Sequence, residues 1–341
     1  LNVNILFLRP AMSLLKILAY ALILTYFGLS WQVAGVTAGV MYAFIQYVNQ
    51  LFNPLIDVMQ NYSVLQTSMV AAERVFELMD RRDFEPDQAE EGPEIQAGNI
   101  DFQHVSFSYD GKREILKDIS FSVKQGETIA FVGSTGSGKS SIINLFLRFY
   151  EFEKGKILID GRDIRDYSQA ELRRNIGLVL QDPFLYHGTI ASNIRMYQES
   201  LSQAEVEEAA RFVDAHDFIS QLPQGYDNPV TERGSTFSSG QRQLLAFART
   251  IATKPKILIL DEATANIDSE TEELIQHSLR KMRQGRTTIA IAHRLSTIQD
   301  ANCIYVLDKG RIIESGSHEE LLAQNGTYKK MYQLQAGMMD A

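Results

Sequence analysis

A charge-poor segment near the start of the chain constrains its fold more than any other feature. Residues 17–72 carry one charged side chain, Asp57, although 22% of the 341 residues are charged and about twelve would be expected here. Two apolar runs, at about residues 10–31 and 34–59, account for it. At about 1.5 Å of rise per residue, each is long enough to cross a hydrocarbon core of about 30 Å as a helix. The sequence therefore predicts an α-helical membrane hairpin.

Basic residues indicate how this hairpin is oriented. Arg9 and Lys16 lie at the start of the first run, and Arg74 follows the second. The short link around residues 31–33 has no basic residue. Because Lys and Arg are enriched on the cytoplasmic side of membrane proteins, we expect both outer ends in the cytoplasm. A helical hairpin buried in a water-soluble core is the alternative, but adjacent runs of spanning length with basic flanks are typical of membrane proteins.

Four amide side chains lie on or after the second run: Asn49, Gln50, Asn53 and Asn61. Polar groups are costly in lipid, so these side chains are expected to face other helices or a water-filled cavity. For Asn61, a position beyond the bilayer on a cytoplasmic extension of the helix agrees equally well with the sequence.

A polar stretch separates the hairpin from the rest of the chain. The helical pattern continues through Met79, and a stretch with two prolines and, from Asp83 to Glu94, six acidic residues then follows. We interpret residues 1–80 as the C-terminal part of a transmembrane domain, 81–98 as a linker and 99–341 as a separate domain. That domain alternates helical runs with β-rich runs at residues 119–123, 128–132, 157–159, 257–260, 287–291 and 304–306. This alternation predicts an α/β domain with a largely parallel core sheet.

Composition argues against several classes of function. The chain has 33 Lys and Arg against 42 Asp and Glu, a net charge of −9, so a nucleic-acid partner is not expected. Cys303 is the single cysteine, which excludes an internal disulfide or a cysteine-cluster zinc site, and we expect it to be a small buried hydrophobe. The chain begins with Leu1 in an apolar region, so we expect it to be part of a longer protein.

A glycine-rich motif follows the predicted strand 128–132 and precedes a helical run at 142–149. Residues 133–140 read GSTGSGKS, which matches G-x-x-x-x-G-K-[ST] in the strand-to-helix context that it requires. Its glycines and N–H groups fold around phosphate, Lys139 reaches the β- and γ-phosphates, and Ser140 offers a hydroxyl to Mg²⁺. The candidate ATP-binding residues are Gly133, Ser134, Thr135, Gly136, Ser137, Gly138, Lys139, Ser140 and Ser141.

Two acidic residues, Asp261 and Glu262, follow the apolar run 257–260 directly. An apolar run of this length is typical of a buried central strand, and α/β sheets place ligand sites at the carboxyl ends of their strands. Asp261 can hold Mg²⁺, and Glu262 can orient or deprotonate an attacking water. Acidic residues after a strand are also common helix N-caps, which is the competing interpretation.

Further motifs resemble those of ABC ATPases. Residues 237–241, FSSGQ, resemble the signature of that family and lie some twenty residues before Asp261. Gln181 is similar to the Q-loop glutamine, residues 265–268 to the D-loop, His293 to the switch histidine and residues 231–234 to the exporter X-loop. Tyr109 is similar to the aromatic residue that stacks on adenine. Taken alone, His293 could be a packed core histidine and Tyr109 an ordinary strand aromatic.

The resemblance covers essentially the whole chain and implies a function. The hairpin looks like the last two of six membrane helices of a B-type ABC exporter, fused to an α/β P-loop ABC ATPase domain with a helical subdomain. ATP and Mg²⁺ are then the expected cofactors, in a multi-pass plasma-membrane protein with a cytoplasmic ATPase domain. The implied roles are: catalysis by Glu262, His293 and Gln181; Mg²⁺ binding by Ser140, Gln181 and Asp261; contact with a partner's ATP by Ser238, Ser239, Gly240 and Gln241; and the D-loop residue Asp268.

The signature departs from the family pattern at two positions. Phe237 replaces Leu and Ser239 replaces the first Gly, while Lys139, Asp261 and Glu262 are intact. A side chain at Ser239 is costly if that position needs a positive φ. An intact nucleotide site beside an altered signature resembles the catalytically competent half of a heterodimeric exporter, so a second exporter half is the expected partner, with a homodimer as the alternative.

Other functions remain open to test. An amphipathic drug is the favoured substrate, with a homodimeric lipid or peptide exporter as the alternative. An ATP-gated channel, a soluble ABC ATPase of DNA repair or translation, and an importer are the competing classes. The charge-poor hairpin and the net charge of −9 weigh against the soluble ATPase.

Overall fold

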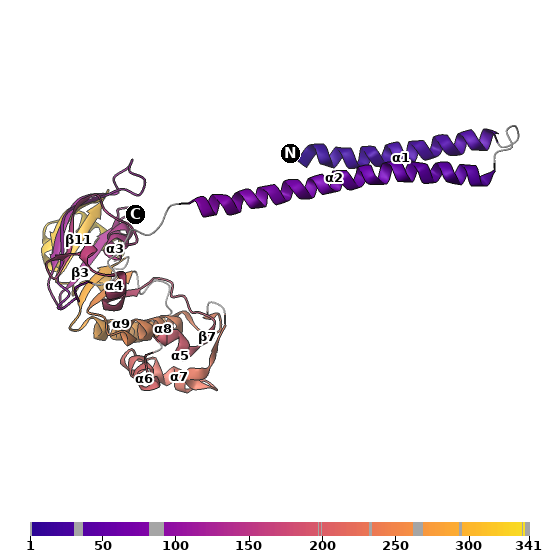
Figure 1. Ribbon diagram of the computed structural model, residues 1–341. Coiled ribbons are helices and arrows are strands. Elements are labelled where there is room, and N and C mark those ends of the chain that lie inside the picture. Colours follow the sequence, from indigo (N-terminus) through magenta and orange to yellow (C-terminus); the bar gives the residue numbers. More distant parts are fainter. Residues whose placement is uncertain are drawn as a thin grey trace. The chain divides into compact units, whose positions relative to one another are not determined.

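The computed structural model has two compact units, Leu1–Glu85 and Pro86–Ala341 (Figure 1). The residues that it describes are 2–30, 37–81, 92–196, 198, 200–231, 234–261, 269–292, 295–335 and 337.

The first unit is a pair of helices, α1 (Asn2–Ser30) and α2 (Ala38–Asp80). Residues later in α1 contact residues earlier in α2, so the pair is an antiparallel hairpin, as Figure 1 shows. Tyr20 donates a hydrogen bond to Asn49 Oδ1 at 2.6 Å, and Lys16 donates to Asn53 Oδ1 at 2.9 Å. The expectation that Asn49 and Asn53 face another helix is therefore confirmed.

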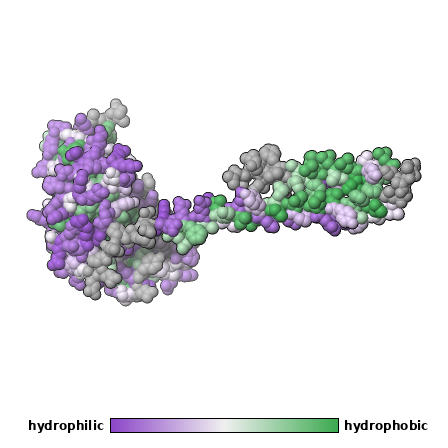
Figure 2. Space-filling view, turned by 45° about the horizontal axis from the view of Figure 1, so that its top comes forward, coloured by the Kyte–Doolittle hydropathy of each residue, from purple (hydrophilic) through white to green (hydrophobic). Residues whose placement is uncertain are grey.

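The surface of the hairpin is largely apolar, as Figure 2 shows, and α2 buries none of its residues. Among the residues that the structure describes, one helix is long and apolar enough to cross a membrane, over Pro10–Leu29 with a mean hydropathy of 1.8. The second predicted span, at residues 34–59, does not reach this level in its described part, because four amide side chains between Gln46 and Asn53 lower its hydropathy. That second span stays a prediction, and the link at residues 31–36 lies outside the described residues.

The core of the second unit is a six-stranded sheet in the order β12-β11-β3-β10-β9-β6. Every neighbouring pair is parallel except β11 and β12, so the expected parallel core sheet is confirmed. Four predicted strands lie within it. Its strands are β3 (Thr128–Gly133), β6 (Ile176–Val179), β9 (Ile257–Asp261), β10 (Thr287–Ile291), β11 (Cys303–Asp308) and β12 (Arg311–Gly316). Cys303 is only partly buried, although its side chain packs against the core.

A second sheet, antiparallel and in the order β2-β1-β4-β5, was not foreseen as a separate layer. It consists of β1 (Ile100–Phe107), β2 (Leu116–Val123), β4 (Lys154–Ile159) and β5 (Arg162–Asp163). Phe102 and Phe121 of this sheet share one apolar core with Phe131 of β3, and helix α3 (Lys139–Phe146) packs into the same core. Packed side chains of β3 and α3 thus hold both ends of the phosphate loop.

Helices gather beyond one side of the parallel sheet, and Figure 1 shows α8 and α9 between the sheet and α5–α7. This agrees with the expected helical subdomain. Besides α3, the helices of this unit are α4 (Gln169–Asn175), α5 (Ile190–Arg195), α6 (Gln203–Phe212), α7 (His216–Ser220), α8 (Ser239–Ala252), α9 (Ser269–Arg283), α10 (His318–Ala323) and α11 (Thr327–Gln335). Short 3₁₀ helices lie at Ile164–Asp166, Gly225–Asp227 and Leu295–Thr297, and β7 (Gly188–Thr189) pairs with β8 (Pro229–Val230).

Asp160 ties the start of this unit to its antiparallel sheet. Its carboxylate accepts hydrogen bonds from the backbone N–H groups of four consecutive residues, 96–99, at 2.8–3.2 Å. It has φ of 50° and precedes Gly161 (φ 78°) in the two-residue turn between β4 and β5, where both residues need a left-handed conformation. Partial burial alone would raise the pKa of Asp160, but the N–H groups, that of Asn99 foremost, outweigh it and hold the pKa below its usual value.

We predict that Asp160→Asn lowers the free energy of unfolding of this unit by about 2 kcal/mol, because a neutral amide cannot hold four N–H donors as a carboxylate does. A depressed folded-state pKa contributes stability that is complete above the unfolded-state value of about 3.9 and is lost as the pH falls through the folded-state value. The difference between the wild type and the variant in thermal unfolding should therefore be equal at pH 7 and pH 5 and shrink below about pH 4. An equal difference at every pH would contradict this origin.

Candidate nucleotide site

The glycine-rich motif forms a loop between β3 and α3, as expected. Its strand is central in the sheet and almost wholly buried. Lys139, at the first position of α3, is 6% exposed, and its Nζ donates to the carbonyls of Gly133 at 2.7 Å and Ser134 at 3.1 Å. The loop therefore encircles the ammonium group. This closes the loop into a concave shape at a helix N-terminus, which is suited to an anion.

Glycine is required at two loop positions, each of which has a positive φ and no room for a Cβ. Gly133 has φ of 153°, and a Cβ there would lie 2.2 Å from the carbonyl oxygen of Leu307 on β11. Gly138 has φ of 111°, and its Cβ would lie 2.7 Å from Leu116 Cδ2. Between them, Ser137 Oγ is buried without a hydrogen-bond partner among the described residues, while Ser134, Thr135, Gly136 and Ser140 are exposed. An unsatisfied buried hydroxyl beside exposed residues fits a loop that receives a polar ligand.

Tyr109, which was predicted to stack on adenine, lies beside this loop. Its hydroxyl is 3.0 Å from Ser141 Oγ and accepts a hydrogen bond from Asn144 Nδ2 at 3.1 Å, so it is held on α3. Its ring is 45% exposed and meets the ring of Tyr150 edge-on at 4.8 Å. A flat, half-exposed ring that is fixed at its hydroxyl can stack on a base.

The carboxyl ends of four parallel strands bring the other candidates to the same edge of the sheet as the loop. Ile291 of β10 is in register with Phe131 of β3 and with Asp261 of β9. Leu260 is in register with Val179 of β6, and the exposed Gln181 follows two residues later. The structure thus brings Asp261 and Gln181 to the edge where the loop begins. Glu262, Asp268 and His293 lie outside the described residues.

The signature residues form the N-terminus of α8. The Ser238 hydroxyl accepts from the N–H of Gln241 at 3.1 Å, and the Gln241 side chain accepts from the N–H of Ser238 at 3.0 Å, which is a complete capping box. Gly240 is needed for packing, because a Cβ there would lie 2.5 Å from Thr271 Oγ1 of α9. Phe237 is 6% exposed and belongs to the apolar core.

Ser239 carries no backbone strain. It is the first residue of α8 and is not among the described residues with positive φ. The steric cost that a positive φ would have imposed is therefore absent, because a helical position accepts any L-residue with a Cβ. Any effect of Ser239 must come from its side chain.

Arg249 of α8 was missed by the sequence analysis. Its guanidinium donates to the carbonyls of Asn193 at 2.8 Å and Phe184 at 2.9 Å and to Asn193 Oδ1 at 2.9 Å. Burial lowers the pKa of Arg249 from its ordinary value. Arg249 thereby holds the segment that follows Gln181. In the sequence, the signal for this role was a cationic residue on the otherwise buried face of a helix.

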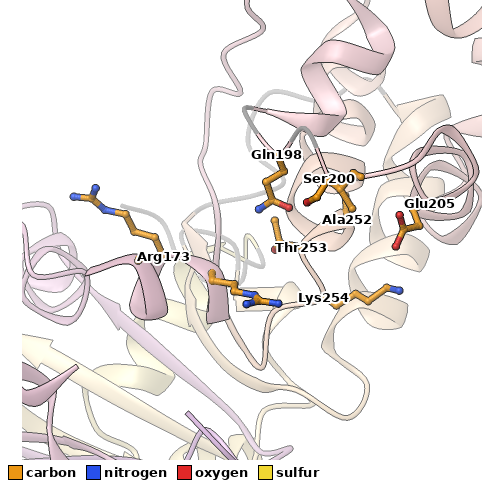
Figure 3. Close-up of a pocket in the computed structure, with 10 residues that line it drawn as sticks. Arg173, Gln198, Ser200, Glu205, Ala252, Thr253 and Lys254 are labelled. Atoms are coloured by element: carbon orange, nitrogen blue, oxygen red, sulfur yellow. The ribbon is translucent and has the colours of Figure 1, made fainter. Parts of the chain in front are cut away.

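A cavity of about 580 Å³ lies elsewhere in this unit (Figure 3). Its walls come from α4, α6 and the end of α8. Because α4 directly precedes β6, the cavity lies toward the amino ends of the strands, away from the loop. Figure 3 shows the side chains of Lys254 and Glu205 on the same side, where their charges offset each other. The cavity is therefore separate from the nucleotide site. Its lining residues are Ala170, Arg173, Arg174, Gln198, Ser200, Leu201, Glu205, Ala252, Thr253 and Lys254.

Comparisons with known proteins agree with this geometry. The family model described as "ABC transporter" matches residues 116–265, which include the phosphate loop, the signature and Asp261. A Streptococcus pneumoniae protein named as a putative ABC transporter ATP-binding protein, exp8, is 72% identical over 334 residues, which are 98% of this chain and 57% of that protein. A Bacillus subtilis protein named as a probable multidrug resistance ABC transporter ATP-binding/permease protein, YheH, is 49% identical over 99% of this chain and 50% of its own length.

One relative and one solved structure extend the comparison. A fatty acid ABC transporter ATP-binding/permease protein of Mycobacterium bovis is 42% identical over 95% of this chain and 51% of its own length. The structure of a bacterial Atm1-family ABC exporter with ATP bound superposes with a TM-score of 0.71 at 40% identity, over 95% of this chain and 56% of that one. The chain thus spans about half the length of these proteins.

Proposed function

We propose that the protein is an ATP-binding/permease subunit of an ABC exporter that couples ATP hydrolysis to efflux, because the chain carries the ATP-binding domain of the ABC transporter family. The observation that carries this proposal is the buried Lys139 inside a loop that lies at the same sheet edge as Asp261. This is the arrangement that phosphoryl transfer needs, since its catalysis consists mainly of positioning and charge stabilisation.

Each candidate residue has a role in the proposed reaction. Lys139 and the loop N–H groups bind the β- and γ-phosphates, and Tyr109 stacks on the adenine. The hydroxyl of Ser140, the amide oxygen of Gln181 and the carboxylate of Asp261 are the hard oxygen ligands that Mg²⁺ prefers. A bound Mg²⁺ would neutralise charge that develops on the phosphates. Glu262 accepts a proton from the attacking water, and Gln181 and His293 orient the water and the γ-phosphate.

Two such chains are needed for a complete site. In this family the nucleotide lies between one domain's loop and the other domain's signature, so Ser238, Ser239, Gly240 and Gln241 are proposed to face the partner's ATP. ATP bound between the domains makes contacts that hydrolysis removes, which drives their separation. We propose a heterodimer, because Phe237 and Ser239 alter the signature while the chain's own loop and strand-end acids are intact.

The heterodimer predicts how the purified full-length protein behaves. Alone it should hydrolyse ATP weakly, because both sites of a homodimer would contain the altered signature. Addition of a partner half with an intact signature should raise kcat at least several-fold. Steady-state ATPase assays in detergent or nanodiscs measure this. Fast, cooperative hydrolysis by the single chain would favour the homodimer.

The apolar hairpin supports a substrate that partitions into lipid. We propose an amphipathic molecule, of the drug type, carried across the plasma membrane by a multi-pass subunit whose ATPase domain lies in the cytoplasm. The names of two relatives, which mention multidrug resistance and fatty acid, support this class. ATP-dependent accumulation of a fluorescent amphipathic dye in inverted vesicles tests the proposal. Dye movement that only follows its gradient would instead indicate an ATP-gated channel.

A further inference from the structure

The C-terminal helix α11 contacts the chain just after His293. The N–H of Leu295 donates to Gln335 Oε1 at 2.9 Å, across 40 residues of sequence. Gln335 is the last residue of α11, and Leu295 is the first residue of the 3₁₀ helix Leu295–Thr297. The first N–H groups of a helix have no acceptor within it. The side chain of Gln335 therefore supplies the acceptor that Leu295 needs.

Ala292, the residue just before His293, is also held by a hydrogen bond. The N–H of Ala292 donates to the carbonyl of Phe131 at 3.3 Å, and Phe131 lies two residues before Gly133 on β3. Ala292 is 7% exposed and Leu295 is 1% exposed. The described residues on either side of positions 293 and 294 are thus both held by backbone N–H groups, Ala292 to β3 and Leu295 to α11.

Helix α11 is itself a firm support. The carboxylate of Glu314 accepts from the N–H groups of Thr327 at 2.5 Å and Tyr328 at 3.0 Å at the start of this helix. Tyr328 is fully buried, and its hydroxyl lies 2.7 Å from His318 Nδ1. The first turn of α11 is thus held by buried contacts, and Gln335 lies exposed at its last turn.

We propose that Gln335 is a positioning residue for ATP hydrolysis, whose side-chain oxygen holds the backbone amide of Leu295, two residues after His293 in the chain. The inference rests on the proposed function, in which His293 orients the γ-phosphate. Gln335 acts through that backbone, so its loss should lower kcat and leave ATP affinity unchanged. A misplacement of about 1 Å in a reacting group can cost up to about 10²-fold in rate.

Three variants of the full-length protein, assayed with its partner half, separate positioning from general packing. Gln335→Ala removes the acceptor and should lower kcat about tenfold, with KM for ATP and ATP affinity within about twofold of the wild type. Gln335→Glu keeps an acceptor oxygen at the same place and should restore kcat. Gln333→Ala, two residues earlier on the same helix, is the matched control and should match the wild type. Equal loss in Gln335→Ala and Gln333→Ala would overturn the proposal.

A double substitution tests whether Gln335 acts through His293. In a His293→Ala background, Gln335→Ala should cause no further loss of kcat, because substitutions of residues that act through one another have non-additive effects. Independent, additive losses would overturn the proposed route.

Hydrogen exchange reports the contact without any assay of activity. Amides of the peptide 292–298 should exchange faster in Gln335→Ala than in the wild type, and at the wild-type rate in Gln335→Glu. Unchanged exchange in Gln335→Ala would refute the contact. Faster exchange with unchanged kcat would refute the positioning role alone, and a wild-type protein that binds but never hydrolyses ATP would overturn the proposed function and this role together.

Discussion

Gly133→Ala should destabilise the ATP-binding unit by about 3 kcal/mol or more and abolish ATP binding. Its φ of 153° is rarely adopted by an L-residue, and the added Cβ would lie 2.2 Å from the carbonyl oxygen of Leu307, a backbone atom of β11. A backbone atom cannot rotate away as a side chain can, so β3 and β11 must separate. In thermal unfolding, this corresponds to a decrease of about 6–12 °C for a unit of this size.

Gly136→Ala is the matched control in the same loop. Gly136 also has a positive φ, 79°, but a Cβ added there would have no atom within 4 Å. Only the left-handed conformation is then penalised, at about 1 kcal/mol, or about 2–4 °C. If the two alanine variants unfold at the same temperature, close packing against Leu307 is not what fixes Gly133. Their difference isolates the steric contribution from the conformational one.

The phosphate loop illustrates what could be predicted from the sequence. Its motif is local, so the strand, the loop and the helix follow one another in the chain and are recognisable there. The position of Asp261 beside the loop was also predictable, because the carboxyl ends of parallel strands meet at one edge. The core strands that were predicted, such as Thr128–Gly133, are those with unbroken apolar runs.

Features that depend on long-range contacts were not predictable. The strand Ile100–Phe107 alternates polar and apolar residues irregularly, and its register shifts near Val105, so its periodicity is weak. The hydrogen bonds of Asp160 and Gln335 join residues separated by some 40 to 64 positions, and no local sequence pattern predicts such partners. Whether Ser239 is strained depends on its backbone conformation, which a single sequence does not reveal.

Glu262→Gln should lower kcat for ATP hydrolysis by about 10²-fold or more and leave ATP affinity unchanged. Glu262 follows Asp261 in the chain, and Asp261 ends β9 at the same edge as the phosphate loop. A glutamine amide keeps the size of the residue but cannot accept a proton from water, so the chemical step alone is affected. Steady-state ATPase rates together with nucleotide binding at equilibrium measure the two quantities separately.

Lys139→Met provides the contrast that identifies which step each residue serves. The ammonium of Lys139 is held by the carbonyls of Gly133 and Ser134 and faces the loop that receives phosphate. Its removal should weaken ATP binding by about tenfold or more, since charge-assisted hydrogen bonds contribute about 1.5–3 kcal/mol. Near-normal hydrolysis in Glu262→Gln would remove Glu262 from its role as the base. Weakened ATP binding in Glu262→Gln, equal to that in Lys139→Met, would instead give both residues the same role in holding the nucleotide.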